Sequence, residues 1–248
     1  MTAAGSAARK VAVIAGAGSG IGAECARLFA RSGYDLALIG RRPEPLQNVA
    51  AECAAHGAQA KVFPADVRDW DRLGQVREEV SACYGGAVDV LINSAGGQFL
   101  ARAEDISSNG WRAVVDVNLN GTFFLCRQFL PLMRVRGASI VVLVANIWQR
   151  AAVRMAHSGA ARAGVVSLVR TLAVEWADYG IRVNALSPGV TATPAVQERY
   201  GGLDHIAAQA PLKRYATPAE IAEAAAFLVN ASYVTGEVLV VDGGLQLV

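Results

Sequence analysis

The sequence has little charge and few of the residues that bind metals. Charged residues make up 18% of the 248 positions, the net charge is +2, and there are only 4 cysteines and 3 histidines. Without a basic cluster, neither a nucleic-acid partner nor a membrane-surface partner is expected. The cysteines are scattered with no CxxC pair, which argues against a zinc site or a disulfide framework and favours a reduced intracellular protein. We therefore predict no bound metal.

Targeting segments and long apolar runs are also missing. No run reaches the ~18 apolar residues needed to span a bilayer, and residues 1–9 lack the apolar centre of a secretory signal. The last three residues, 246–248, are not a peroxisomal signal of the Ser-Lys-Leu type. We expect a cytoplasmic protein with a frayed tail over residues 1–9.

What the sequence does have is apolar content, because 53% of its residues are hydrophobic. Short runs rich in β-branched residues are continuously apolar, as in parallel strands that are buried on both faces. They are 11–15, 36–39, 61–63, 88–92, 140–144, 181–186 and 238–241. Helical patterns lie between them, at 21–32, 44–56, 69–84, 111–135, 158–179 and 218–230. The alternation predicts an α/β protein with a single-domain Rossmann fold over residues 1–248, whose doubly wound, seven-stranded parallel sheet has helices on both faces.

The stretch 188–215 follows the sixth predicted strand and has no strong periodicity. A loop of that length in a compact domain usually has a function. We predict that it is a substrate loop.

Glycines recur between the first predicted strand and the first predicted helix, where residues 16–22 are Gly-Ala-Gly-Ser-Gly-Ile-Gly. Glycine lets the backbone approach a pyrophosphate closely, and the N-terminus of the next helix stabilises its charge. A tight turn alone would also use glycine, but the strand before and the helix after favour a dinucleotide site. The residues expected to bind the cofactor here are Gly16, Ser19, Gly20, Ile21 and Gly22.

Two arginines, Arg41 and Arg42, follow the second predicted strand, where NAD-binding sites usually have a carboxylate. A guanidinium can bind a phosphate with two hydrogen bonds, and no acid is adjacent to repel it. This favours NADPH over NADH, the alternative being that one or both arginines are solvated surface charges.

These glycines, together with the segments 66–67, 93–96 and 188–189 and Asn118, resemble the short-chain dehydrogenase/reductase family over essentially the whole chain. The resemblance implies a homotetramer or a homodimer, and it implies that Asn118 stabilises the active-site helix. It also implies that Arg162, at the family's lysine position, faces the nicotinamide ribose. The remaining cofactor contacts that it implies are Asp66, Val67, Asn93, Ala95, Gly96, Pro188, Gly189, Val190 and Thr191.

The family's catalytic tyrosine and serine are absent from this chain. Aligning Arg162 with the family's lysine puts Ser158 at the tyrosine position and Ala145 at the serine position. The i, i+4 spacing still directs Ser158 and Arg162 to one face of a helix. A serine hydroxyl is far too weak an acid to replace a phenol, so ordinary alcohol–ketone interconversion is disfavoured.

A narrower resemblance accounts for this loss. The segments 96–100, 105–111, 157–165 and 195–201 resemble the peroxisomal trans-2-enoyl-CoA reductases and, at a greater distance, the 2,4-dienoyl-CoA reductases. These families reduce a C=C bond conjugated to a thioester with NADPH, and the enolate formed needs hydrogen-bond donors more than a full proton. Gln98 and Ser158 match polar positions of the dienoyl-CoA enzymes, but Ile147 replaces a tyrosine that those enzymes use.

We therefore predict an NADPH-dependent ene reductase that acts on an acyl thioester or an enone. The candidate catalytic residues are Gln98, Asn118, Ser158 and Arg162, and the candidate substrate-lining residues are Phe99, Trp148 and Tyr200. His157 is adjacent to Ser158, but one helical step turns its side chain ~100° away, so packing is favoured over a role as general acid. Two alternatives are a carbonyl reductase with a non-standard proton donor and an inactive NADP-binding protein.

Overall fold

The computed structural model describes residues 9–200 and 204–248, without the side chains of residues 199 and 200. Parallel strands form one seven-stranded sheet in the order β3-β2-β1-β4-β5-β6-β7. The strands are β1 (Val11–Ala15), β2 (Asp35–Gly40), β3 (Ala60–Pro64), β4 (Val90–Asn93), β5 (Ala138–Leu143), β6 (Ile181–Pro188) and β7 (Val238–Val241). The predicted doubly wound fold is confirmed.

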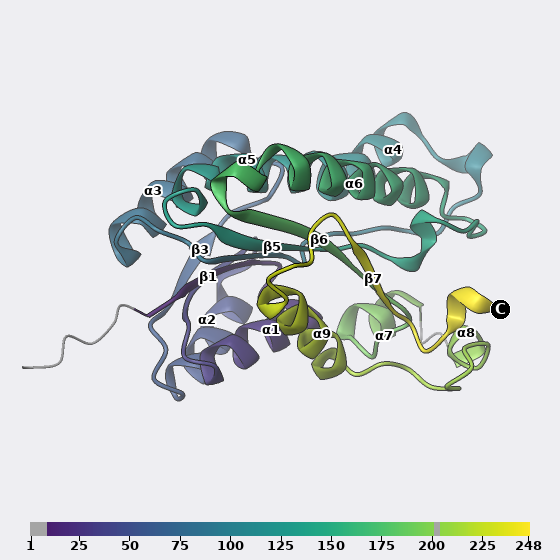
Figure 1. Cartoon of the computed structure of the whole chain (residues 1–248). Helices are drawn as coiled ribbons and strands as arrows, with labels where there is room; N and C mark the ends of the chain where they lie inside the picture. The colour runs from purple at the N-terminus through teal and green to yellow at the C-terminus, as the bar shows by residue number, and fades with distance from the viewer. Residues whose placement is uncertain (1–8, 201–203) are drawn as a thin grey trace, which may run out of the picture.

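Helices cover both faces of the sheet (Figure 1). One layer contains α3 (Trp70–Tyr84), α4 (Ser108–Val115), α5 (Gly121–Met133) and α6 (Ala156–Glu175). The other layer contains α1 (Gly20–Arg31), α2 (Pro43–Ala54) and α9 (Pro218–Asn230). Two short helices, α7 (Pro194–Tyr200) and α8 (Asp204–Ala207), lie near the end of β7.

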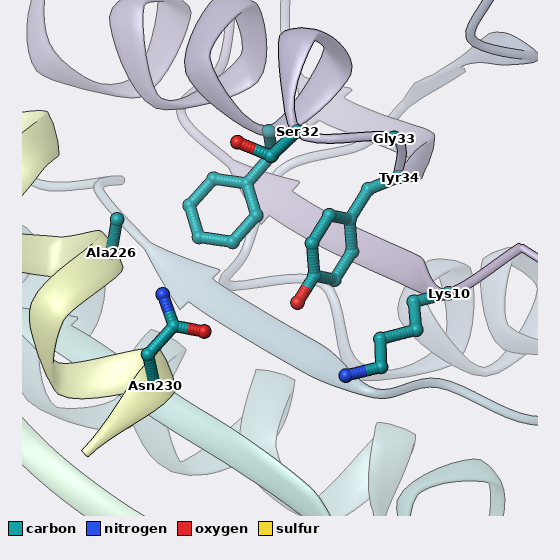
Figure 2. Close-up of a pocket in the computed structure, with 7 residues that line it drawn as sticks. Lys10, Ser32, Gly33, Tyr34, Ala226 and Asn230 are labelled. Carbon is teal, nitrogen blue, oxygen red and sulfur yellow. The ribbon is translucent and has the colours of Figure 1, made fainter.

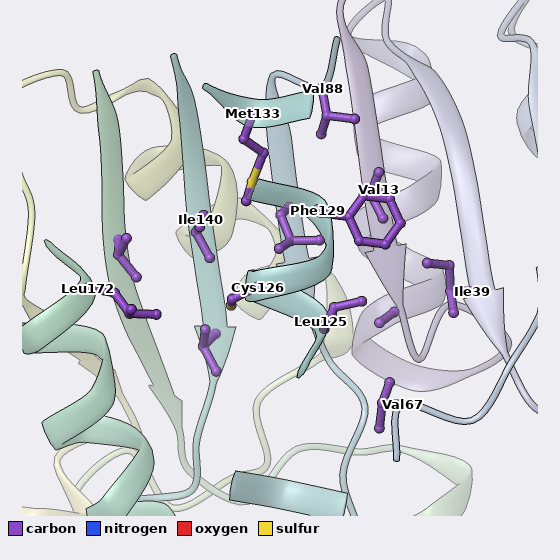
Figure 3. Close-up of a cluster of buried hydrophobic side chains, with 14 of the residues drawn as sticks. Val13, Ile39, Val67, Val88, Leu125, Cys126, Phe129, Met133, Ile140 and Leu172 are labelled. Carbon is purple, nitrogen blue, oxygen red and sulfur yellow. The ribbon is translucent and has the colours of Figure 1, made fainter. Parts of the chain in front are cut away.

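The hydrophobic core has two parts because successive strand residues point to opposite faces of the sheet. Val13 of β1, Phe129 of α5 and Ile140 of β5 belong to the same part of the core, which Figure 3 shows. The next residue, Ile14, belongs to the other part, beneath α1 and α9. All five residues of β1 are buried, which explains why its sequence is continuously apolar.

The strand order reverses at β1, which pairs with β2 on one side and with β4 on the other. The helices that follow these two strands, α1 and α4, lie on opposite faces of the sheet, and this arrangement forms a crevice at its carboxyl edge. In doubly wound folds this crevice is where ligands bind.

The stretch 111–135, predicted as one helix, is interrupted. Between α4 and α5 lies a π-helical turn, Asp116–Asn120, within which Asn118 is buried. A single π-helical turn inside an α-helix is too short to be recognised from the hydrophobic periodicity of the whole stretch. Trp111 of α4 is 42% exposed.

The segment 188–215, predicted to be a substrate loop, contains regular secondary structure. Strand β6 continues to Pro188, and the segment contains helices α7 and α8. Thr191 forms an isolated parallel bridge with Ala216, so the start of this segment is tied to its end.

The predicted tail also needs one correction. Arg9 is anchored by hydrogen bonds from Nε to the Gly33 carbonyl (3.1 Å) and from Nη1 to the Gly57 carbonyl (2.8 Å). Residues 1–8 lie outside the described residues. None of the helices in residues 9–200 and 204–248 has the length and apolarity that crossing a bilayer requires.

Candidate active site

The glycines after β1 are required by close backbone contacts. Gly16 has φ +79°, and a Cβ atom there would lie 2.7 Å from the backbone nitrogen of Ala95. A Cβ atom on Gly22 would lie 2.3 Å from the carbonyl oxygen of Gly16. The β1–α1 turn thus packs directly on the loop after β4, and no side chain fits between them.

The N-terminus of α1 suits an anion. Ser19 is its N-cap residue, but the hydroxyl makes no capping hydrogen bond, and the first turn contains no acid. The exposed N–H groups at Gly20 and Ile21 and the positive end of the helix dipole can therefore stabilise a phosphate. Gly20 has φ +55°, and a Cβ atom there would lie 3.2 Å from Cγ2 of Thr193, so the segment after β6 lies over this turn.

Cationic side chains lie where β2 and β3 end. Arg41 and Arg42 are both exposed and have no hydrogen bond or ion pair with another described residue. The Arg68 guanidinium forms a bidentate pair with Asp66 and holds the pKa of that carboxyl below its usual value, and Arg41 lowers it further. Val67, beside Asp66, is buried. A dinucleotide with an extra phosphate fits this edge, because the two free arginines can neutralise it.

A buried polar network holds the loop after β4. Asn93 Nδ2 donates to Thr122 Oγ1 (2.9 Å), and that hydroxyl donates to the Asn118 carbonyl (2.6 Å). The Asn118 side chain donates to the carbonyl of Gly97 (2.8 Å) and accepts from its N–H (3.3 Å). The Asn118 side chain also donates to the Val114 carbonyl in its own helical segment (2.7 Å), and its role in stabilising the active-site helix stays a prediction.

The next residue, Gln98, meets Ser158 of α6. The Ser158 hydroxyl donates to Gln98 Oε1 at 2.7 Å, and Ser158 is completely buried. The structure thus brings together the two polar side chains that the sequence offered as enolate donors. Because Oε1 accepts the serine proton, the amide nitrogen is the group of Gln98 that can donate to a substrate oxygen.

Arg162 lies one turn further along α6 and is largely buried. Its Nη1 donates to the Leu143 carbonyl at the end of β5 (2.7 Å), while its Nε has no partner among the described residues. Burial lowers the pKa of Arg162 to about 10, so the guanidinium stays charged at neutral pH. Ala145, which the resemblance aligns with the family's serine, is half-buried and follows β5 at the same edge of the sheet.

The end of β6 forms another wall of the site. The Gly189 N–H donates to the Val241 carbonyl (2.9 Å), and a Cβ atom on Gly189 would lie 2.7 Å from Cα of Asp242. Thr191 is buried and donates to the Gly189 carbonyl (3.2 Å). Pro188 and Val190 are half-buried beside it.

The candidate lining residues do not form one cavity. Trp148 lies on a cavity of about 430 Å³ with Ile147 and Met155, whereas Phe99 is 40% exposed and contacts the His157 ring instead. The Tyr200 side chain lies outside the described residues. A second hollow of about 340 Å³, shown in Figure 2, lies at the opposite, amino edge of the sheet, where Lys10, Tyr34 and Asn230 line it.

Sequence reasoning did not identify Thr122, Thr193 or Arg68. Thr122 lies four residues after Asn118, and that spacing alone could have suggested a shared role on one helix face. Thr193 is revealed only by its tertiary contact with Gly20. Arg68 pairs with Asp66 only two residues away, so their proximity in the sequence could have suggested this ion pair. In the described part of the chain, no three His, Cys, Asp or Glu side chains gather as metal ligands.

Comparisons with known proteins agree with this geometry. Residues 16–246 match the family model described as enoyl-(acyl carrier protein) reductase. A probable 2,4-dienoyl-CoA reductase of Bacillus subtilis is 38% identical, over 96% of this chain and 97% of the relative. A galactitol 2-dehydrogenase of Cereibacter sphaeroides is 41% identical, over 94% of this chain and 93% of the relative.

The fold has close solved counterparts as well. A variant of the actinorhodin polyketide ketoreductase, solved with NADPH, superposes with a TM-score of 0.90 at 34% identity, and the match covers 96% of this chain and 97% of that one. The glycine turn, the strand order and these full-length relatives lead to one conclusion. The chain belongs to the short-chain dehydrogenase/reductase family of NAD(P)-binding oxidoreductases.

Proposed function

We propose that the protein is an NADPH-dependent ene reductase that reduces a C=C bond conjugated to a thioester carbonyl. The observation that carries the proposal is the 2.7 Å hydrogen bond from Ser158 to Gln98, at the place where the family usually has its tyrosine acid. Relatives named as 2,4-dienoyl-CoA reductases, at 36–38% identity, support the same reaction class.

NADPH would be held by the β1–α1 turn through its diphosphate, by Arg41 and Arg42 through its extra phosphate, and by Asp66 and Val67 near the adenine. The nicotinamide end of the cofactor would be contacted by Asn93, Ala95, Gly96 and the segment 188–191. Arg162 would contact the nicotinamide ribose. When bound, the cofactor supplies a hydride. The free guanidinium groups of the two arginines support NADPH over NADH.

The residues of the chain then act on the thioester. The Gln98 amide donates a hydrogen bond to the thioester oxygen, where negative charge collects once hydride has reached the β-carbon. Ser158 fixes the direction of that amide by donating to its oxygen. The positive charge of Arg162 stabilises the enolate electrostatically, and the α-carbon takes its proton from solvent. No step requires the acidity of a phenol.

The test is NADPH oxidation with crotonyl-CoA and 2-decenoyl-CoA beside a panel of ketones. Turnover of the enoyl thioesters is expected. Turnover of ketones alone would favour a carbonyl reductase, a reading supported by the galactitol dehydrogenase relative. Tight NADPH binding without turnover of either panel would favour an inactive NADP-binding protein.

We also propose a homotetramer or a homodimer. Trp111 of α4 and Phe123 of α5 are 42% and 41% exposed, and a partner subunit would cover such aromatic side chains. Light scattering coupled to size-exclusion chromatography tests this directly, and a monomeric mass would refute it.

A further inference from the structure

The residue before Ser158 is a histidine that the proposed reaction leaves unused. His157 is completely buried, and its Nδ1 accepts the backbone N–H of Ser158 at 2.8 Å. We infer that His157 is a positioning residue for the Gln98–Ser158 pair, which it holds through this hydrogen bond and through its contact with Phe99. The inference rests on the proposed function.

The start of α6 has no side-chain cap from its N-cap residue. The helix begins at Ala156, and its N-cap residue, Met155, provides no side-chain hydrogen bond. The N–H groups of a first helical turn have no partner inside the helix and are usually capped by Ser, Thr, Asp or Asn. Here the imidazole of His157 accepts the N–H of Ser158, so the backbone that carries the Ser158 hydroxyl is fixed from within the turn.

Two contacts join the β4 loop to the start of α6. Ser158 binds Gln98, and the neighbouring residues His157 and Phe99 stack edge to face, with ring centroids 4.4 Å apart and planes at 90°. A single hydrogen bond would let the Gln98 side chain rotate about it. The second contact, one residue away on each segment, fixes the relative rotation of the β4 loop and of α6.

The hydrogen bond from Ser158 also depends on the protonation state of His157. An Nδ1 that accepts a hydrogen bond requires the neutral ring with its proton on Nε2. Burial has the largest effect on the pKa of His157 and lowers it, which favours the neutral ring, while a hydrogen bond with the Met155 backbone acts in the opposite direction. Nε2 is buried without a hydrogen-bond partner among the described residues. A protonated ring would direct a second N–H at the amide of Ser158 and break the contact.

Two substitutions separate positioning from packing. In His157→Asn a side-chain oxygen can still accept the Ser158 N–H, whereas His157→Leu keeps apolar bulk and has no acceptor. We expect His157→Leu to lower kcat for 2-decenoyl-CoA about 10-fold with an unchanged KM for NADPH, and His157→Asn to restore most of the rate. Equal losses, or no loss in either variant, would overturn the inference.

Two further measurements keep the inference testable. In a Ser158→Ala background, His157→Leu should have no additional effect, and an additive loss would contradict action through Ser158. Because there are 3 histidines in the chain, ¹⁵N-histidine NMR of the wild type can report the tautomer of His157, assigned through the His157→Asn spectrum. A proton on Nε2 supports the inference, and a proton on Nδ1 refutes it. A wild type with no enoyl turnover would refute the proposed function alone, since the NMR result does not require catalysis.

Discussion

Nη2 of Arg162 lies against the α-carbon of Gly96, so that a Cβ atom on residue 96 would be only 2.6 Å from it. The same Cβ atom would be 2.8 Å from Oδ1 of Asn118. Glycine at 96 therefore makes room for the buried guanidinium and for the amide that holds Gly97.

This contact predicts the effect of Gly96→Ala. The added methyl group must displace the Arg162 side chain or the β4 loop, which should lower the free energy of unfolding by about 1–3 kcal/mol and weaken NADPH binding. Urea denaturation and fluorescence titration measure the two effects. Adding Arg162→Lys should recover part of the loss, because a lysine lacks the second terminal nitrogen, and no recovery would assign the strain to Asn118 instead.

Removing the Gln98 amide should slow catalysis rather than substrate binding. Gln98→Ala should reduce kcat on an enoyl thioester about 10–100-fold, the usual range for the loss of one oxyanion donor. Steady-state kinetics with 2-decenoyl-CoA provides the measurement. An unchanged kcat would remove Gln98 from the site.

Arg41→Ala should weaken NADPH binding about 10-fold, because a charge-assisted hydrogen bond to the extra phosphate is lost, and should leave NADH binding nearly unchanged. Calorimetric titration with both cofactors tests this. Arg170→Ala is a matched control, since Arg170 is also exposed but lies on α6. Equal losses for both cofactors would rule out the phosphate contact.

Loss of the Thr122 hydroxyl should lower the free energy of unfolding. Thr122→Val keeps the shape but leaves the buried Asn93 Nδ2 without its acceptor, at a cost of about 1–3 kcal/mol in the free energy of unfolding. Thr122→Ser retains the hydroxyl and serves as the control. Equal midpoints of denaturation for Thr122→Val and the wild type would show that the hydrogen bonds of Thr122 do not stabilise the fold.

Burial of His157 predicts a pH dependence of folding. An unfolded histidine binds its proton near pH 6.5, whereas the folded pKa is lowered by burial. Below about pH 6.5 the unfolded chain therefore binds more protons, and the free energy of unfolding falls as the pH falls until the folded pKa is passed. Urea titrations between pH 5 and about 7.5 should show a shallower slope in His157→Asn, and identical slopes would contradict this.

The parts of the fold that depend on local sequence were predictable. The limits of β1 and β7 agree with the prediction because each is a short, continuously apolar run between turn residues. The glycines at 16 and 22 were identifiable because a tight turn between a strand and a helix requires them locally.

Features that depend on contacts between distant segments could not be predicted from the sequence. The π-helical turn at 116–120 is too short to be recognised from hydrophobic periodicity, and the hydrogen bond between Thr122 and Asn93 joins α5 to the end of β4. The resemblance pointed to Gln98 and Ser158 separately, but only the folded chain brings the two side chains within 2.7 Å. The aromatic candidates were chosen by residue type, and packing put Phe99 on His157 and Trp148 on a separate cavity.

The central pairing of β1 with β4 has a consequence for how the chain folds. Val13 pairs with Leu91, so the middle of the sheet joins residues far apart in the sequence. Such non-local parallel pairing slows folding, because a long loop must close before the contact is made. During synthesis β1 leaves the ribosome early and has to remain unpaired on that side until β4 has emerged. In that interval its five apolar residues are exposed to aggregation, which predicts a better refolding yield at low protein concentration.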